Sequence, residues 1–387
     1  MQHTIPPTMP LHHQATYQAA RTVAPKVEAY FSQKLALTGQ EASEKLAPAP
    51  SLQVIETVID TAFWASLRRE EGLPPKISLA FLPPEHVEQP LLFERRLPLT
   101  PEALIKIAPG VERAGIHLGV WQENEALYVW GTTHTVPSNS FIVDVPEPGL
   151  LVVKHRRTDG LGKFANVAVL KGDQVKLVDE GSASLPDCPE LLTSLLGFTS
   201  PDATANVLIQ LAVSMREHKR GGTLLVVPHQ STTWRQSIVH PIKYAVQPSF
   251  CGLADLMKQE EPLKKRSRWQ ASLRREVASI AGLTAVDGAT LLTDTYELLA
   301  FGTKIARRPG FSPVERLLFT EPVIDSRPAI IHPTTQGGTR HLSAAQFVHD
   351  QRNAMALVAS QDGSFTIFAW SPCEDMVQAH RIDTLLL

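Results

Sequence analysis

Cysteine is scarce in this sequence. Cys188, Cys251 and Cys373 lie far apart in a chain of 387 residues, and no two of them have the CxxC spacing. An odd number of dispersed cysteines argues against a disulfide framework, and the missing CxxC pairs argue against a zinc site. We therefore expect a reduced compartment and ordinary packing roles for these side chains.

Long apolar runs are also missing. No stretch reaches the ~18 apolar residues that a membrane-spanning helix needs. The first ten residues contain neither a basic start nor an apolar core, so no secretion signal is expected. These absences predict a cytoplasmic protein that has no membrane partner.

Neither sign of charge dominates, since 37 Lys and Arg against 39 Asp and Glu leave a formal net charge of −2. This balance provides no general attraction to a nucleic acid polymer. The basic run at residues 264–268 is most simply a solvated surface. The run at residues 160–163 lacks the spacing and the following Ser or Thr of a phosphate loop, and no HExxH or Gly-x-Ser-x-Gly string is present.

A chain of this length exceeds one ordinary hydrophobic core, which predicts two domains. Residues 1–50 are polar, apart from a candidate helix from Ala15 to Leu37. Residues 51–180 are expected to form a β-rich domain. An amphipathic helix at residues 51–71 opens it, with Ser51 as N-cap. Its expected strands are Ile77–Leu82, Ile116–Trp121, Ala126–Trp130, Phe141–Val145, Leu150–Lys154, Phe164–Leu170 and Gln174–Val178.

Two tryptophans of this domain, Trp121 and Trp130, flank a predicted hairpin. They either line a ligand pocket or pack in the sheet, and packing is the commoner role of such residues. The Ser- and Pro-containing segment Gly181–Pro189 is the best linker candidate. After it, helical periodicity returns, and helices alternate with strands. Residues 198–372 are therefore expected to form a mixed sheet flanked by helices, and the whole chain is classed as α/β (α+β).

Two short strings in the last third of the chain carry the functional signal. Asp287-Gly288-Ala289 lies between two apolar stretches, so the aspartate is expected at a strand edge or turn. The string from Gly338 through Thr339 and Arg340 to His341 opens a segment with apolar Leu342, Ala345 and Val348 at helical spacing. Free N–H groups at a helix start favour a phosphate, and a carboxylate holds the metal that accompanies a polyphosphate.

Simpler interpretations exist for each string on its own. Asp-Gly is a common turn pair, and Arg340 and His341 could begin a solvated helix. However, Gly337 and Gly338 directly before them permit close backbone approach to a ligand. Both strings together therefore favour a nucleotide site over two unrelated surface features.

The two strings resemble the DGA and GTRHR motifs of the diadenylate cyclases. The resemblance extends over about residues 200–372, with the order of elements preserved: a basic helix end at residues 215–220, a glycine turn, a core strand at residues 224–227 and a closing hairpin around residues 360–363. Two positions depart from the family pattern. Leu342 replaces the second arginine of the later motif, and Ser360-Gln361-Asp362 replaces its Ser-Glu-Glu turn. Both changes remove charge from the expected triphosphate site.

The resemblance implies an enzyme that joins two ATP molecules into cyclic di-AMP, regulated through the N-terminal domain. Two such domains would meet face to face in a homo-oligomer. Asp287 would hold Mg²⁺ or Mn²⁺, and Asp287, Arg340 and His341 would be the catalytic residues. The nucleotide would be bound by Gly288, Ala289, Gly338, Thr339, Arg340, Ser360 and Asp362.

A second hypothesis is that the protein binds a nucleotide at this site without catalysing a reaction. The same pocket would bind ATP or a cyclic dinucleotide and report through the N-terminal domain. Leu342 and Gln361 favour this sensor, whereas the intact Asp287 and Arg340-His341 favour the enzyme. A purely structural protein remains a third alternative, and it requires the two strings to match by coincidence.

Overall fold

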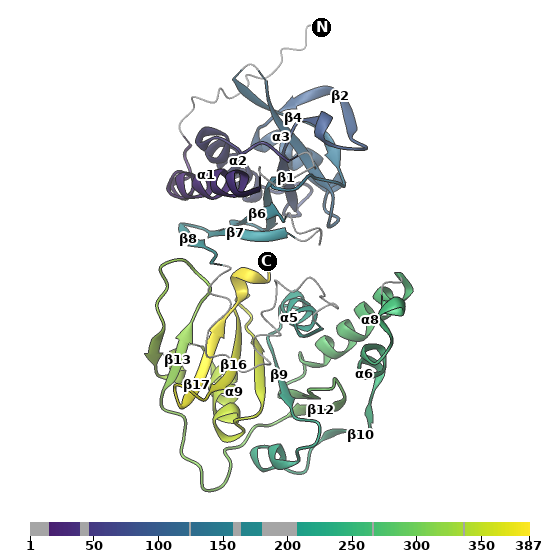
Figure 1. Ribbon diagram of the computed structural model, residues 1–387, viewed down its shortest axis with the longest axis vertical. Coiled ribbons are helices and arrows are strands. Elements are labelled where there is room, and N and C mark those ends of the chain that lie inside the picture. The colour runs from purple at the N-terminus through teal and green to yellow at the C-terminus, as the bar shows by residue number, and fades with distance from the viewer. Residues whose placement is uncertain are drawn as a thin grey trace. The chain divides into compact units, whose positions relative to one another are not determined.

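The computed structural model describes residues 15–38, 46–123, 125–157, 164–179, 207–264, 267–335 and 337–387. The chain divides into two compact units, Met1 to Val178 and Asp179 to Leu386, which we name unit 1 and unit 2. Each unit has its own mixed sheet with helices, so the expected α/β (α+β) class is confirmed (Figure 1). The linker predicted at Gly181–Pro189 lies outside the described residues.

Unit 1 is built on a sheet with strand order β2-β4-β3-β1-β5-β6-β7-β8. All seven strands predicted from the sequence pattern are present, and β2 and α3 are additional. The elements are α1 (Gln18–Thr38), α2 (Leu52–Ser66), β1 (Ile77–Phe81), η1 (Pro84–His86), β2 (Leu91–Pro98), α3 (Pro101–Ile107), η2 (Ala108–Gly110), β3 (His117–Glu123), β4 (Ala126–Thr133), β5 (Phe141–Glu147), β6 (Leu150–Arg156), β7 (Phe164–Lys171) and β8 (Gln174–Leu177).

The helix α2 is stabilised by the N-cap and the apolar residues from which it was predicted. The Ser51 hydroxyl accepts a hydrogen bond from the N–H of Val54 at 3.4 Å, which confirms the N-cap. Ile55, Val58 and Ile59 of its apolar stripe are buried in a core shared with α1 and the sheet. The helix ends at Ser66 rather than near residue 71, because the polar residues 68–71 have no apolar face to bury.

Unit 2 holds a second sheet, with strand order β10-β12-β11-β9-β15-β16-β17-β13-β14. In chain order its described elements are α5 (Val207–Glu217), β9 (Gly222–Val227), η3 (Thr233–Ser237), β10 (Tyr244–Phe250), α6 (Gly252–Met257), α7 (Glu261–Lys264), α8 (Ser267–Leu283), β11 (Ala289–Thr293), β12 (Leu298–Thr303), β13 (Leu317–Thr320), β14 (Ala329–Ile331), η4 (Pro333–Thr335), α9 (Thr339–Asp350), β15 (Met355–Ala359), β16 (Phe365–Ser371), β17 (Met376–Arg381) and η5 (Asp383–Leu385).

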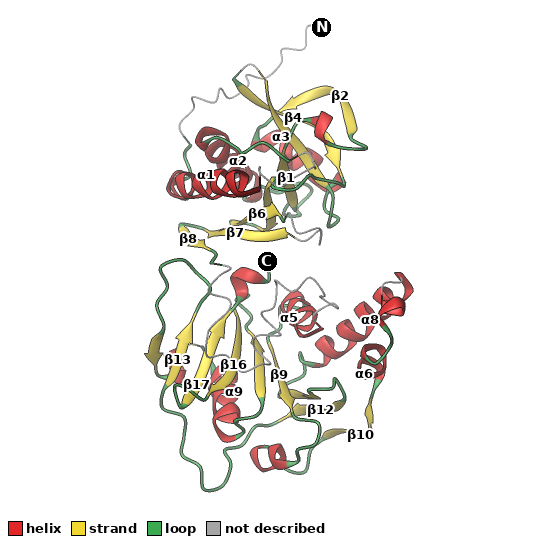
Figure 2. Cartoon of the chain, in the orientation of Figure 1, coloured by secondary structure: helices red, strands yellow, loops and turns green. Residues whose placement is uncertain are grey.

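Helices cover both faces of the central strands of unit 2 (Figure 2). On β9, Leu224 and Val226 pack in a core with α5 and α8, whereas Leu225 and Val227 pack in a core with α9. A strand buried on both faces reads as a continuous apolar run, which is why the sequence predicted it well. β17 lies beyond residue 372 and completes the same sheet between β16 and β13. Among the described residues of either unit, no helix is long and apolar enough to span a bilayer.

A buried histidine on β17 should make the stability of unit 2 depend on pH. Burial lowers the pKa of His380 to about 4, whereas a histidine in an unfolded chain titrates near ~6.5. Between these values the unfolded chain binds the additional proton. Stability present above pH ~6.5 is therefore lost as the pH falls toward 4, by at most about 1.4 kcal/mol per pH unit for this residue.

Urea denaturation at a series of pH values checks this expectation. The Nδ1 atom of His380 lies 2.7 Å from the hydroxyl of Thr320, and an Asn side chain keeps a polar group there. His380→Asn should therefore show a shallower loss of unfolding free energy between about pH 6.5 and pH 4.5 than the wild type. Equal slopes for the two proteins would contradict the assignment to His380.

Candidate functional site

The two strings meet at one edge of the unit 2 sheet. β9 and β11 are parallel, with Thr223 opposite Ala289, so both strands begin at the same edge. β15 runs antiparallel to β9 and ends there, with Ala359 opposite Gly222. The edge therefore combines the glycine turn before β9, the Asp287 string before β11 and the turn after β15.

The Asp287-Gly288-Ala289 string leads into β11 with a tightly constrained backbone. Gly288 has a φ of +115°, and a Cβ at this position would lie 2.5 Å from the carbonyl carbon of Gly302. A residue with a side chain does not fit there without movement of the backbone. Ala289 is buried, and its carbonyl accepts a hydrogen bond from the Thr303 hydroxyl at 2.8 Å. The strand start is thus fixed, and it leaves the side chain of Asp287 90% exposed at the edge.

Two cations act on the Asp287 carboxylate. The Nζ atom of Lys304 donates a hydrogen bond to Oδ2 at 2.6 Å, and this bond and its charge hold the pKa of Asp287 below the usual value. The charge of Arg340 lowers the pKa further, to a smaller degree. Lys304 follows β12, a strand that the sequence pattern does not predict, and so sequence reasoning missed this residue.

The second string forms the start of α9, as predicted. Gly338 is the N-cap, and it makes no side-chain cap. Thr339 and Arg340 form the first turn, where backbone N–H groups face away from the helix and can bind an anion. The Arg340 side chain extends to the glycine turn, since a Cβ on Gly221 would lie 3.0 Å from its Nη1 atom.

The imidazole of His341 points into the core. It is 2% exposed, and it contacts the ring of Phe368 at a centroid distance of 5.9 Å. Burial lowers the pKa of His341, and the charges of Arg381 and Arg340 lower it further, whereas Asp362 raises it. Of the expected apolar stripe, Ala345 and Val348 are buried, but Leu342 is 36% exposed, and His341 takes its place on the buried face of α9.

The turn after β15 is held by its own polar side chains and by the basic segment before β9. Asp362 accepts hydrogen bonds from the backbone N–H of Ser364 at 3.0 Å and from its hydroxyl at 2.8 Å. Ser360 closes the turn through its N–H to the Ser364 carbonyl. The Nε atom of Arg216 donates to the carbonyl of Gly363 at 3.0 Å. Ser360 and Asp362 are therefore placed at the edge that also holds Arg340.

The side chains at this edge limit how a metal ion could be bound. No group of three or more His, Cys, Asp or Glu side chains able to hold a metal occurs in the described part of the chain. Mg²⁺ is usually bound by one or two carboxylates together with substrate phosphates and water. The exposed carboxylate of Asp287 fits that pattern as a single protein ligand.

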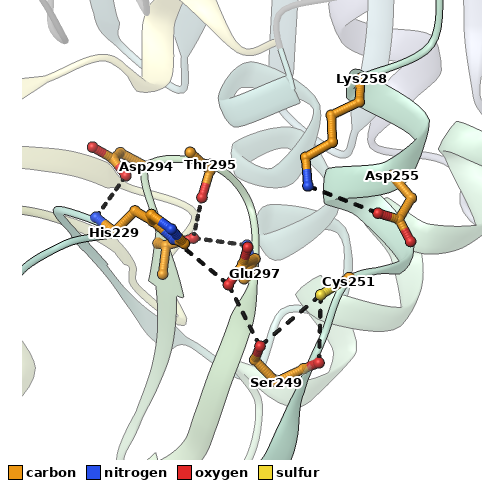
Figure 3. Close-up of polar contacts among 9 residues, drawn as sticks. His229, Ser249, Cys251, Asp255, Lys258, Asp294, Thr295 and Glu297 are labelled. Carbon is orange, nitrogen blue, oxygen red and sulfur yellow. Dashed lines mark hydrogen bonds and ion pairs between the residues drawn. The ribbon is translucent and has the colours of Figure 1, made fainter.

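A second polar cluster, not predicted from the sequence, lies at the opposite end of β11 (Figure 3). Glu297 joins two neighbours there, since its Oε2 atom lies 3.6 Å from His229 Nδ1 and 3.4 Å from the Ser249 hydroxyl. The backbone N–H of His229 donates to Asp294 at 2.8 Å. These contacts fasten the loop after β9 to the β11–β12 turn. Cys251 lies beside them and donates weakly to the Ser249 carbonyl, in keeping with a packing role.

Comparison with known proteins finds a similarity in unit 1. Residues 44–134 match the family described as "Probable sensor domain DACNV". The matched segment includes α2, α3 and the strands β1 to β4. A search of curated proteins finds no match. Residues 44–134 are therefore similar to a probable sensor domain, in line with the regulatory role that the resemblance implies for the N-terminal domain.

Replacing Gly288 by Ala tests whether the strand start is as constrained as its geometry indicates. The positive φ and the backbone overlap should destabilise unit 2 by about 1–3 kcal/mol or more. Gly282→Ala is the matched control, because no atom lies within 4 Å of a Cβ there and the residue is inside α8. The control should be neutral or slightly stabilising. Chemical denaturation that ranks the two variants equally would contradict the geometry.

Proposed function

We propose that unit 2 is a diadenylate cyclase-like nucleotidyltransferase that condenses two ATP molecules into cyclic di-AMP, with unit 1 as its regulatory sensor. Two independent lines support this proposal. The family matched by unit 1 is associated with diadenylate cyclases. Unit 2 carries a DGA string and a GTRH string that resemble those of the cyclases.

The observation that carries the proposal is the convergence of these strings. Asp287 and Arg340 belong to different elements, yet the charge of Arg340 acts on the carboxyl of Asp287. Arg340 also lies against Gly221, in the turn before β9. An anion bound at the start of α9 would therefore lie near both a carboxylate and a guanidinium. If the two strings were unrelated surface features, there would be no reason to expect them at the same edge of the sheet.

The proposed roles follow from the position of each group. Thr339, Arg340 and the backbone after Gly338 would bind phosphate oxygens and stabilise the charge of the departing pyrophosphate. Gly288 and Ala289 would let the base or ribose approach the backbone. Asp287 would hold Mg²⁺ or Mn²⁺, and such an ion would supply Lewis-acid activation of the attacking 3′-hydroxyl.

Lys304 adds a group that the sequence did not reveal. It neutralises Asp287 at 2.6 Å, and both side chains are largely exposed. A metal ion on Asp287 would compete with this lysine. The long lysine side chain could then turn toward the phosphates, where an ammonium group is a common ligand.

His341 and the turn after β15 are proposed to position the site. A buried, neutral imidazole cannot offer charge to a phosphate, so His341 would act by packing below the helix start. Asp362 and Ser360 close the turn beside the nucleotide. Because each 3′-hydroxyl must reach the α-phosphate of the opposite ATP, two such edges would face each other in a homo-oligomer.

A nucleotide sensor without turnover is the second candidate. Leu342 is partly exposed on α9, at the position of the second arginine in the cyclase motif. Gln361 is engaged with the carbonyl of Arg220 at 3.4 Å, where the cyclase turn has a carboxylate. Compared with the cyclase motifs, Leu342 and Gln361 reduce the charge around the site, whereas Thr339 and Arg340 are unchanged. The two candidates therefore agree on binding and differ in catalysis.

Arg340→Ala tests the phosphate site. Loss of a charge-assisted contact costs about 1.5–3 kcal/mol, and because Arg340 is exposed the lower value is expected, a weakening of ATP binding of about tenfold. Arg316→Ala is a matched control, since Arg316 is an exposed arginine outside the edge. Isothermal calorimetry with ATP should separate the two variants. If ATP binds the Arg340 variant as tightly as the wild type, Arg340 is only a surface residue.

Asp287→Asn separates catalysis from binding. Charge moves onto the bridging oxygens as the 3′-oxygen attacks, so the metal-holding carboxylate matters most in the transition state. The variant should therefore lose cyclic di-AMP formation and keep weakened nucleotide binding. Asp255→Asn is the control, because Asp255 forms a similar exposed pair with Lys258, at 3.9 Å, away from the edge.

The measurement is mass spectrometry of long incubations with ATP and Mg²⁺ or Mn²⁺ at high protein concentration. Wild-type activity should fall on dilution, since two half-sites must meet. A wild type that binds ATP and forms no product under these conditions would establish the sensor candidate instead. Absence of both binding and product would refute the nucleotide site itself.

A further inference from the structure

Unit 1 contains a cavity of about 200 Å³ whose lining includes three aromatic side chains, Trp121, Tyr128 and Trp130. Residues along β4 alternate between two environments. Leu127 and Val129 are buried in the core shared with α1 and α2, whereas Tyr128 and Trp130 line the cavity. Trp121 on β3 lies directly opposite Tyr128 in the strand register. The sheet therefore presents a group of aromatic rings to one small space.

The ring of Trp130 is fixed as a wall of this cavity. A Cβ on Gly119 would lie 2.0 Å from the Trp130 ring, so the glycine leaves the room that the indole occupies. The indole N–H donates to the carbonyl of Leu82 at 2.9 Å. Because its polar group is already satisfied, Trp130 offers the cavity only its ring. Trp121 is supported by Phe81, at a ring-centroid distance of 4.7 Å, and stays partly exposed.

The charges at the cavity leave an excess of negative charge. Arg96 pairs with Glu123, so these two largely offset each other. Glu85, on η1, also lines the cavity and is exposed. Its carboxylate forms no ion pair with any residue that the structure describes. The cavity thus combines aromatic faces with one carboxylate available to a ligand.

We propose that this cavity binds a small organic cation that carries an alkylated ammonium group. Aromatic faces attract cations through the ring quadrupole, and cages of Trp and Tyr are well suited to ammonium groups that cannot donate hydrogen bonds. The carboxylate of Glu85 favours a cation over an anion. Drug-sized ligands occupy cavities of about 300–1,000 Å³, so this smaller space selects a compact head group.

The site lies inside the segment that matches the sensor family, at residues 44–134. The inference therefore gives the probable sensor domain a ligand class. It does not depend on the nucleotide chemistry proposed for unit 2, because every residue involved belongs to unit 1. Failure of either proposal leaves the other standing.

Calorimetry on the full chain tests the proposal with three probes at matched ionic strength. Choline represents a free cation, a peptide with Nε-trimethyllysine represents the same group on a partner, and 3,3-dimethylbutan-1-ol is the uncharged isostere of choline. At least one cation should bind about tenfold or more tightly than the neutral alcohol. Which of the two cations binds better identifies the source of the ligand. Equal affinity for all three probes, or no binding of either cation, overturns the proposal.

Variants then locate the binding. Tyr128→Leu removes an aromatic face and should weaken binding of the cation about fivefold, whereas Tyr128→Phe keeps the ring and should retain it. Glu85→Gln should weaken binding about twofold to fivefold, and Glu88→Gln is the control, because Glu88 is exposed and does not line the cavity. Circular dichroism checks that each variant is folded. A folded Tyr128→Leu protein with wild-type affinity would place the binding elsewhere and refute this site.

Discussion

The parallel pairing of β9 with β11 is the contact on which the candidate site depends. It aligns Thr223 with Ala289, so that residues more than sixty positions apart begin at the same edge. A parallel pair needs a long crossover, and here the chain returns through α8 to the start of β11 and passes the start of β9 on the way. A Cβ on Gly222 would lie 2.6 Å from the hydroxyl of Thr284, which shows how closely the two segments approach. Asp287 reaches the edge only because this packing fixes where β11 begins.

The ion pair at that edge is exposed, so it stabilises the fold little and can be replaced by another cation. Asp287 is 90% exposed and Lys304 is 57% exposed. Ion pairs in such exposed surroundings contribute little to folding. The pair can therefore open at low cost when another cation takes the carboxylate. Arg340 also lies close enough to lower the pKa of Asp287, so two cations act on this one carboxylate.

The sequence predicted the elements that have a clear period. α2 and α9 have apolar stripes, β9 is buried on both faces, and turn residues separate the apolar segments that form the strands of unit 1. β2 escaped because its residues are mostly exposed and leave no alternation to detect. β10 is also largely exposed and contains Pro248, a residue uncommon inside strands. Periodicity records burial, so strands that bury little leave no signal.

Features of the site that depend on residue type could be predicted from the sequence. Features that depend on strand register or on the rotation of a helix could not. Gly288 marks tight backbone, and the structure gives it that role, whereas a Cβ on Gly338 would meet no atom within 4 Å. Lys304 depends on the register of β12 against β11, which is interrupted by irregular pairing. The burial of His341 depends on the rotation of α9, since a face through Leu342 and a face through His341 differ by one residue. Neither fact is contained in a local pattern.

Regulation of unit 2 by a ligand of unit 1 has a strict thermodynamic condition. A ligand shifts an equilibrium only as far as it binds one state better than another. The proposed cation site is a partly rigid cage, because Trp130 is fixed by Gly119 and by its bond to Leu82. If the cation changes the affinity for nucleotide, then nucleotide must change the affinity for the cation by the same factor, since the coupling free energy is shared. That reciprocity makes a change in cation binding a measure of regulation even where unit 2 forms no product.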